Sequence, residues 1–591
     1  MRLINVHTMD FEQFLGSRIP KYAILSHTWE EEEVSYHAMF SSSRSDRKGF
    51  AKIEMTCRLA RESGLNYAWV DTCCIDKSSS AELTEAINSM YRWYQRAEVC
   101  YAYLADLEPD QRARQEFLKS CRWFSRGWTL QELIAPTTMK FFDAAWNTIG
   151  TKIGLVDRLE SITGIDRRIL LNIQPLDSIA VAQKFSWAAN RTTTRIEDVA
   201  YCLLGIFDVN MPLLYGEEEK AFIRLQFEII KSNADLSILA WKAPAKVPGR
   251  GETVAGRVAR WSKSKEDERV YCGVLADTPM SFASCGSFKS GLAIGPREFA
   301  VTNYGIKTKI QVLSDPPTTK CGPRYILPLE CYDECGQSLG IRLRKCGPDT
   351  FFREDPHNLV AYPDDLFTNA AKNRYLLMKL PRLTEDTETP FLDEHSLRET
   401  TYLAQMRPHA LQVILADATT IYDAWPWSRY DDEDCLFFTP WSRLPTKMDV
   451  CMMRLMTKIT YVNKGKDIDV EFETMFIAAG WASERRDHLQ CTLLDYQSMA
   501  SDLKDLESQI VSWEHDRSQV LQELERRKIP RRSAVTFSVP GTESDVCMSF
   551  SLNRKDERAI CRNWFWTLSF SYDVDVPLSE FRVNEGSWKL L

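Results

Sequence analysis

The segment YAWVDTCCIDKSSSAELTEAINSMYRWYQRAEVCYAYL, residues 67–104, contains the pattern that decides the fold. Its two ends, 67–70 and 99–104, are short apolar runs rich in residues that favour strands. Between them, Ser79 and Glu82 have the spacing of a capping box, and apolar side chains then recur at helical spacing. The segment therefore predicts a strand, a helix and a second strand.

Two more apolar runs extend this alternation, at 22–25 upstream and at 139–142 downstream. Short strands that alternate with longer helices are typical of a parallel sheet wrapped by helices. We therefore predict an α/β domain over residues 1–150, in which a parallel sheet is flanked by helices.

The rest of the chain has a different pattern. Residues 151–235 predict an all-helical unit, with Thr194 and Glu197 as a second capping box. From 236 to 591, Pro and Gly become frequent and short β-rich runs dominate, so this part is predicted to be β-rich. One amphipathic helix is expected within it, near 497–528.

Composition excludes several classes of protein. A chain of 591 residues is too long for one hydrophobic core, and a net charge of -8 gives no attraction for nucleic acid. The start lacks the apolar stretch of a secretory signal, and no segment approaches the roughly 20 apolar residues of a membrane helix. An odd number of cysteines, 17, indicates reduced thiols. We expect a cytoplasmic protein without a membrane span and without a nucleic-acid partner.

Polar side chains follow the first two strands of the predicted sheet. Ser26, His27 and Trp29 come after the first, and Asp71 and Asp76 come after the second. Ligands of parallel α/β sheets bind outside the carboxyl ends of the strands, where these groups would meet. An indole to stack on a base and carboxylates to accept from sugar hydroxyls suit a ribose-bearing ligand. Alternatively, the Ser and Asp side chains only cap the helices that follow.

A further carboxylate lies in the segment CRWFSRGWTLQELIAP, residues 121–136. Trp128 and Glu132 are four residues apart, so on a helix both would lie on one face. Burial beside an indole raises the pKa of a carboxylate and suits it to chemistry at a glycosidic bond. The alternative is a helix in which Trp128, Leu130 and Leu133 pack inward while Glu132 pairs with an arginine.

Motifs for other chemistry are missing or incomplete. The sequence has no GxGxxG after a strand and no GxxxxGK[ST], so it supports neither a dinucleotide fold nor a nucleotide triphosphatase. Cys321, Cys331, Cys335 and Cys346 cluster in the sequence, but they lack the paired CxxC spacing of zinc sites. We predict no metal site and no required cofactor.

Three long blocks resemble the signature blocks of the fungal heterokaryon-incompatibility (HET) domain. They are YAILSHTWEEEEVSY at 22–36, YAWVDTCCIDKSSSAELTEAINSMYRWYQRAEVCYAYLADL at 67–107 and WFSRGWTLQELIAP at 123–136. A fourth block, from 185 to 231, resembles the helical region that commonly follows HET domains. Glu30 stands where the family usually has Gly after SHTW, and Glu218 replaces a second Gly in YGEGEKAF.

This resemblance implies a role in programmed cell death after non-self recognition. HET domains are similar in fold to Toll/interleukin-receptor (TIR) domains, several of which cleave the bond between nicotinamide and ribose in NAD. Their glutamate lies in a block that residues 125–133 resemble, which implies Glu132 as the catalytic residue and NAD as the substrate. The same resemblance implies that Ser26, His27 and Trp29 line the nucleotide pocket and that Asp71 and Asp76 assist. Trp128, assigned by its spacing from Glu132, completes the predicted substrate-binding set.

Two hypotheses about activity follow. In the first, the protein forms a homo-oligomer on activation and depletes NAD as an innate-immune effector, under the control of an incompatibility partner protein. In the second, it is a non-enzymatic scaffold that signals only by homotypic assembly, and its polar residues stabilise the fold.

Overall fold

A computed structural model provides the three-dimensional structure. The residues that it describes are 1–111, 115–243, 271–291, 298–303, 305–315, 324–362, 372–377, 410–415, 419–425, 429–432, 435–438, 450–463, 466–479, 490–496, 522–523, 526–527, 533–538, 545–554, 565–574 and 581–582. Most of the helix predicted near 497–528 therefore lies outside the described residues.

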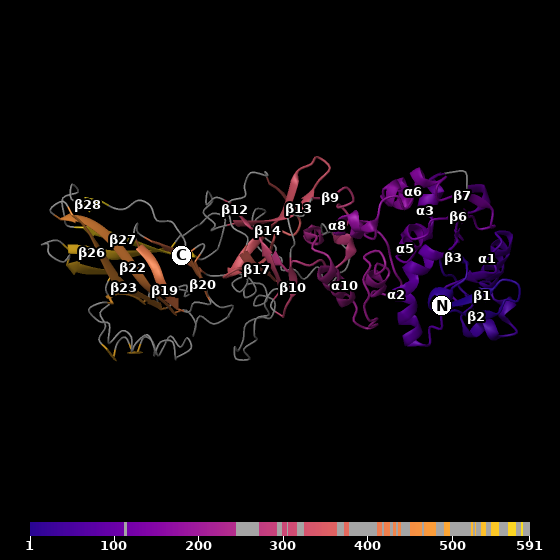
Figure 1. Ribbon diagram of the computed structural model, residues 1–591, viewed down its shortest axis with the longest axis horizontal. Helices are drawn as coiled ribbons and strands as arrows, with labels where there is room; N and C mark the ends of the chain where they lie inside the picture. The colour runs from indigo at the N-terminus through magenta and orange to yellow at the C-terminus, as the bar shows by residue number, and fades with distance from the viewer. Residues whose placement is uncertain are drawn as a thin grey trace, which may run out of the picture.

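The N-terminal part contains a mixed sheet with the strand order β2-β1-β4-β3-β5-β6-β7 (Figure 1). Its four central strands, β4, β3, β5 and β6, are parallel and coincide with the four predicted runs. The bounds are β1 Arg2–Asn5, β2 Phe11–Gln13, β3 Ala23–His27, β4 Tyr67–Trp69, β5 Val99–Tyr103, β6 Met139–Phe142 and β7 Thr148–Thr151.

The prediction of a wholly parallel sheet is wrong at both edges. Strand β2 pairs with β1, and β7 pairs with β6, in antiparallel hairpins, and β1 also runs antiparallel to β4. The short connections of the two hairpins, β1–β2 and β6–β7, can only join antiparallel neighbours, because a parallel pair needs a crossover of a dozen or more residues. At the second hairpin, Asp143 Oδ1 accepts from the backbone N–H groups of Ala145 and Asn147 and holds the turn.

Helices connect the parallel strands as predicted. They are α1 Phe50–Glu62, α2 Ser80–Arg96, α3 Gln115–Ser120, α4 Arg122–Ser125 and α5 Thr129–Ile134. Ser79 caps α2 by accepting from the backbone N–H of Glu82 at 3.3 Å. The Glu82 carboxylate does not complete the box, because it accepts instead from Arg2 and from the backbone N–H of Asp76.

The middle region contains short helices separated by long turns. These helices are α6 Val156–Thr163, α7 Arg167–Leu170, α8 Val181–Ser186, α9 Asp198–Tyr201, α10 Lys220–Ser232 and the 3-10 helix η6 Leu236–Leu239. No helix begins at Thr194, contrary to the predicted capping box. The Glu197 carboxylate accepts from the backbone N–H of Gly216 instead, so it fixes a later turn.

The C-terminal part is rich in strands, as predicted, and the described strands form three sheets. The first contains β8 Tyr271–Cys272, β9 Lys289–Ser290, β10 Phe299–Val301, β11 Ile306–Ile310, β12 Leu313–Asp315, β13 Arg324–Tyr332, β14 Ser338–Gly347, β15 Thr350–Glu354, β16 Val360–Ala361 and β17 Lys372–Leu376. The second contains β18 Ala410–Ile414, β20 Tyr430–Asp431, β21 Leu436–Phe438, β25 Ala534–Ser538, β26 Asp545–Arg554 and β27 Phe565–Val574. The third contains β19 Thr419–Trp425, β22 Val450–Asn463, β23 Lys466–Ala479, β24 Gln490–Asp495 and β28 Phe581–Arg582.

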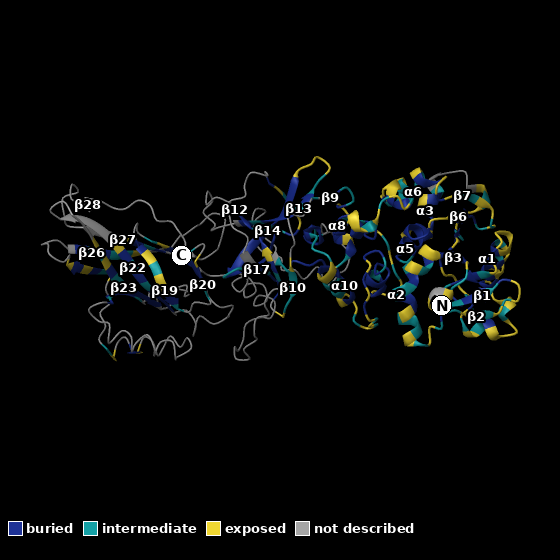
Figure 2. Cartoon of the chain, in the orientation of Figure 1, coloured by how far each residue is buried: buried dark blue, intermediate teal, exposed yellow. Residues whose placement is uncertain are grey.

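One buried core crosses the boundary between the N-terminal and C-terminal parts. It runs from Leu3 in the first strand to Leu376 in β17 and includes the middle helices. A separate core, from Leu411 to Phe570, fills the space between the second and third sheets. Figure 2 shows these buried positions in dark blue along the whole length of the molecule.

Candidate functional site

Strand β3 brings the first two candidate residues to the carboxyl edge of the sheet. Successive side chains of a strand point to opposite faces, so Ser26 and His27 lie on different sides of the sheet. The Ser26 side chain contacts Glu132 of α5, whereas His27 contacts Lys52 of α1. Helices α5 and α1 therefore cover opposite faces, and the site has two halves.

The first half is centred on Glu132, which is buried with 6% of its surface exposed. Ser26 Oγ donates a hydrogen bond to Glu132 Oε2 at 2.5 Å and accepts one from Trp123 Nε1 at 2.8 Å. Tyr94 is also hydrogen-bonded to Glu132, although its single proton is donated to the Leu25 carbonyl oxygen at 2.9 Å. Tyr94 Oη can therefore only accept a hydrogen bond from Glu132, and this requires a protonated carboxyl group.

The electrostatics of Glu132 agree with a protonated carboxyl group. Burial raises its pKa to about 8, and the negative charge of Asp71 acts in the same direction. The hydrogen bond from Ser26 opposes this rise without cancelling it. No lysine or arginine within the described part of the chain lies at ion-pair distance from Glu132. At neutral pH the carboxyl group is therefore mostly neutral.

The second half is centred on Asp71, which follows β4. His27 Nε2 lies 3.0 Å from Asp71 Oδ1, and Trp29 Nε1 donates to Asp71 Oδ2 at 2.8 Å. Burial alone would raise the pKa of Asp71, but the hydrogen bond from His27, the charge of Lys77 and the hydrogen bond from Trp29 hold it down at about 2. Lys77 Nζ lies 3.4 Å from the centre of the Trp29 ring. An ionised carboxylate is thus fixed beside an indole that is 44% exposed.

Lys52 closes this half from α1. Its ammonium group donates to Glu33 at 2.6 Å and to His27 Nδ1 at 3.4 Å, and it pairs with Glu30 at 2.9 Å. Because Lys52 can only donate, His27 Nδ1 accepts and the ring proton lies on Nε2, facing Asp71. Glu30, where the resemblance leads us to expect Gly, also pairs with Arg122 at 3.5 Å, so it ties the end of β3 to α4.

The structure places Asp76 and Trp128 outside these two clusters. Asp76 accepts from the backbone and side chain of Ser78 and stabilises its own turn. Trp128 Nε1 donates to Asp198 Oδ2 at 3.2 Å, so its indole is turned towards the middle region. Ser26, His27, Trp29, Asp71 and Glu132 are brought to one edge of the sheet. Asp71 connects the halves, because it is hydrogen-bonded to His27 and its charge raises the pKa of Glu132.

Three important residues were not among the predicted site residues: Lys52, Tyr94 and Trp123. Tyr94 and Trp123 have the apolar spacing of helix residues that face a core, so the sequence gives no sign of their polar contacts. Lys52 is 6% exposed, and a lysine is buried only when its charge is paired. The run of acidic residues from Glu30 to Glu33 is the sequence feature from which an ion pair with a buried lysine could have been predicted.

Part of the chain matches a known protein family and a curated relative. Residues 22–120 match the family described as Heterokaryon incompatibility protein (HET). Vegetative incompatibility protein HET-E-1 of Podospora anserina is 43% identical to this chain over 271 residues, which are 44% of this chain and 19% of that protein. The chain carries a fungal HET domain. It spans about a fifth of the length of the curated relative that it matches.

The HET domain is followed by a second matched segment, residues 220–316, described as a domain of unknown function (DUF8212). No solved structure matches the chain, so its likeness to TIR domains stays a prediction. Over the described ranges, the chain contains no helix long and apolar enough to cross a membrane. Nor does this part of the chain hold a group of His, Cys, Asp and Glu that could bind a metal ion.

Proposed function

We propose that the protein acts in heterokaryon incompatibility, as a cytoplasmic effector that self-associates after non-self recognition and kills the cell by cleaving NAD. The HET domain and the name of its Podospora relative support the biological role. The observation that carries the chemical proposal is Glu132, a buried carboxyl group with a pKa near 8, hydrogen-bonded to Ser26 at the carboxyl end of β3.

The reaction would break the bond between nicotinamide N1 and ribose C1′. The bonding electron pair leaves with nicotinamide, which becomes neutral, and a water oxygen forms the new bond to C1′ while its proton is released to solvent. Positive charge develops on the ribose in the transition state, and an ionised Glu132 would stabilise it. The cationic nicotinamide ring would itself favour ionisation of Glu132 when NAD binds.

The remaining site residues have roles in binding. Trp29 offers an exposed indole face for the base once Lys77 moves away, and the ionised Asp71 offers acceptors for sugar hydroxyl groups. Lys77 could then turn to the phosphates, because its ammonium group already lies over that face.

The second candidate is the non-enzymatic scaffold. It is favoured by the burial of Glu132, because the described contacts of its carboxyl group are all to other side chains of the protein. A substrate could reach this group only if α4 or α5 moved.

The test uses the full chain, because its first core is completed only at β17. NAD loss and nicotinamide release are measured at rising protein concentration for the wild type, for Glu132→Gln and for the surface control Glu62→Gln. We expect turnover that increases with concentration, is abolished in Glu132→Gln and is retained in Glu62→Gln. The value of kcat/KM should rise with pH up to about 8. Absence of turnover at every concentration, together with cell killing by Glu132→Gln, would refute the enzyme and support the scaffold.

A further inference from the structure

The segment that carries Glu132 is bonded to the region that follows the HET domain. The backbone N–H of Thr192 donates to the Ser125 carbonyl at 2.7 Å, and the backbone N–H of Gly127 donates to the Thr192 carbonyl at 2.9 Å. Arg126 and Thr192 form a parallel β-bridge between these bonds. The start of α5 is thus fixed to a chain segment about 65 residues later, not only to its own domain.

Arg191 adds side-chain bonds at the same place. Its Nη1 atom donates to the Arg126 carbonyl at 2.8 Å and to Thr129 Oγ1 at 3.0 Å, while its Nε donates to the Trp187 carbonyl at 3.2 Å. Hydrogen bonds from a charged donor are stronger than those between neutral groups. A single guanidinium group therefore joins the turn before α5, the first residue of α5 and the middle region.

A chain of hydrogen bonds leads from Arg191 to the carboxyl group. Thr129 Oγ1, which accepts from Arg191, donates to the Trp123 carbonyl at 2.5 Å. The Trp123 indole then donates to Ser26 Oγ at 2.8 Å, and Ser26 donates to Glu132 at 2.5 Å. Trp123 and Ser26 are fully buried, so water cannot replace these partners.

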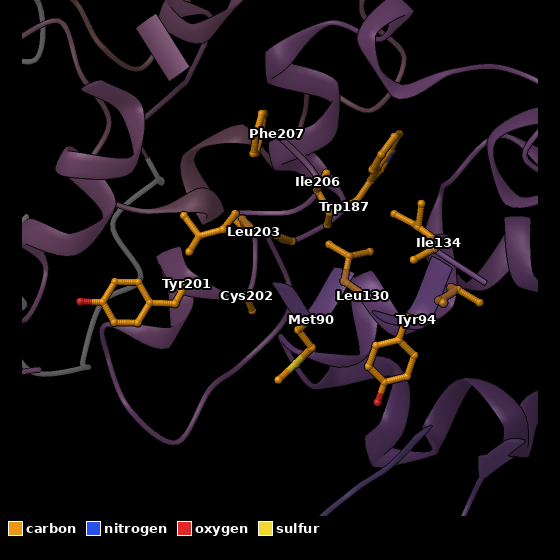
Figure 3. Close-up of a cluster of buried hydrophobic side chains, with 14 of the residues drawn as sticks. Met90, Tyr94, Leu130, Ile134, Trp187, Tyr201, Cys202, Leu203, Ile206 and Phe207 are labelled. Atoms are coloured by element: carbon orange, nitrogen blue, oxygen red, sulfur yellow. The ribbon is translucent and has the colours of Figure 1, made fainter. Parts of the chain in front are cut away.

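The opposite face of α5 is packed against the same region. Figure 3 shows Leu130 and Ile134 of α5 in one cluster of buried side chains with Trp187, Leu203 and Ile206 of the middle region. Both Leu130 and Ile134 are buried, with at most 2% of their surface exposed. Helix α5 therefore lies between the sheet and the middle region, and a shift of the middle region would move it.

We propose that Arg191 is a positioning residue through which the region after the HET domain controls the placement of Glu132. The inference deepens the proposed function and rests on it for its effect on turnover, but the placement itself can be measured without NAD. Arg191 does not touch the substrate-facing residues Trp29 and Asp71 in the described contacts. Its loss should therefore affect kcat and leave KM nearly unchanged.

The test compares Arg191→Met, which keeps the apolar stem, with Arg191→Lys, which keeps one charged donor. The matched control is Arg167→Met, because the Arg167 side chain is 54% exposed on α7 and forms a surface ion pair with Asp157. Amide hydrogen exchange of the full chain is followed by mass spectrometry over residues 23–27 and 125–134. NAD turnover is measured on the same samples.

We expect Arg191→Met to lower the protection of both segments about tenfold, to lower kcat at least about tenfold and to change KM less than about twofold. Arg191→Lys should restore part of each loss, and Arg167→Met should behave as wild type. Unchanged protection of 23–27 and 125–134 in Arg191→Met would overturn the inference. If the wild type lacks turnover, the proposed function fails, and the exchange data alone decide whether Arg191 positions Glu132. If Arg191→Met does not fold, the Arg191→Lys exchange data take its place with the same two outcomes.

Discussion

Replacement of Glu132 by glutamine should remove a specific pH dependence of stability. The folded pKa of about 8 lies above the ordinary value of 4.5, so between these values the folded protein holds a proton that the unfolded chain has released. Stability is then complete below about pH 4.5 and falls as the pH rises towards 8. A glutamine amide can accept from Ser26 and donate to Tyr94, so the variant keeps both bonds without titrating.

The size of the effect follows from proton linkage. Each pH unit between the two pKa values costs the wild type about 1.4 kcal/mol relative to the variant, or about 2–3 kcal/mol between about pH 5.5 and about pH 7.5. Amide exchange of peptides from β3 and α5 measures this difference locally, because protection reports the free energy of opening of those segments. Both proteins are compared at the same pH, so the chemical exchange rate cancels in the ratio. The ratio of wild-type to Glu132→Gln protection should fall about tenfold per pH unit. A ratio independent of pH would show that Glu132 is ionised in the folded protein and would refute the assignment of a neutral carboxyl group.

Three further variants test the packing and the charges around the site and the middle region. Ser26→Ala leaves Glu132 without its hydrogen-bond donor and the Trp123 indole without its acceptor. Thermal unfolding should therefore show a free energy of unfolding lower by about 2–5 kcal/mol. An unchanged melting temperature would contradict this expectation. Asp71→Asn removes a carboxylate whose stabilising effect is present above pH 3.8 and is lost as the pH falls towards 2. Urea unfolding at neutral pH should therefore show a free energy of unfolding lower by about 2 kcal/mol, and this difference should disappear in acid. The same variant should lower the pKa of Glu132, which would appear as a shift of the exchange ratio to lower pH. Arg353 of β15 donates to the carbonyl oxygens of Leu239 and Trp241, and so joins the end of the middle region to the first C-terminal sheet. Arg353→Met leaves both oxygens without this charged donor and should cost about 3–5 kcal/mol, measured as loss of exchange protection in η6. Equal protection would show that Arg353 does not stabilise this junction.

The parallel strands were predictable because each is a short, mostly apolar run that is largely buried on both faces. Strand β3 is an example, since all of its residues are buried. The antiparallel edges were not predictable in the same way. Strand β2, Phe11–Gln13, has three residues and no buried position, so its sequence carries almost no strand pattern. It forms because β1 offers an edge next to it.

The candidate site was predictable only where chemistry and strand position coincide. Ser26 and His27 end β3, Asp71 lies just after β4, and topology alone brings them together. Trp128 was assigned by its spacing from Glu132, but α5 begins one residue later, at Thr129. Trp128 is therefore the N-cap residue, and its indole bonds to Asp198, a residue 70 positions away that no local pattern could reveal.

The continuity of the first core has a consequence for how the protein is made. The ribosome delivers the middle helices, which end at Leu239, well before Leu376, the last residue of that core. At about 5–20 residues per second, the interval is roughly 7 to 27 seconds. During this time the part of the apolar surface that packs on the C-terminal strands has no partner, although the part that packs on α5 is already covered. The core that supports the candidate site is therefore complete only after the first C-terminal sheet has been synthesised.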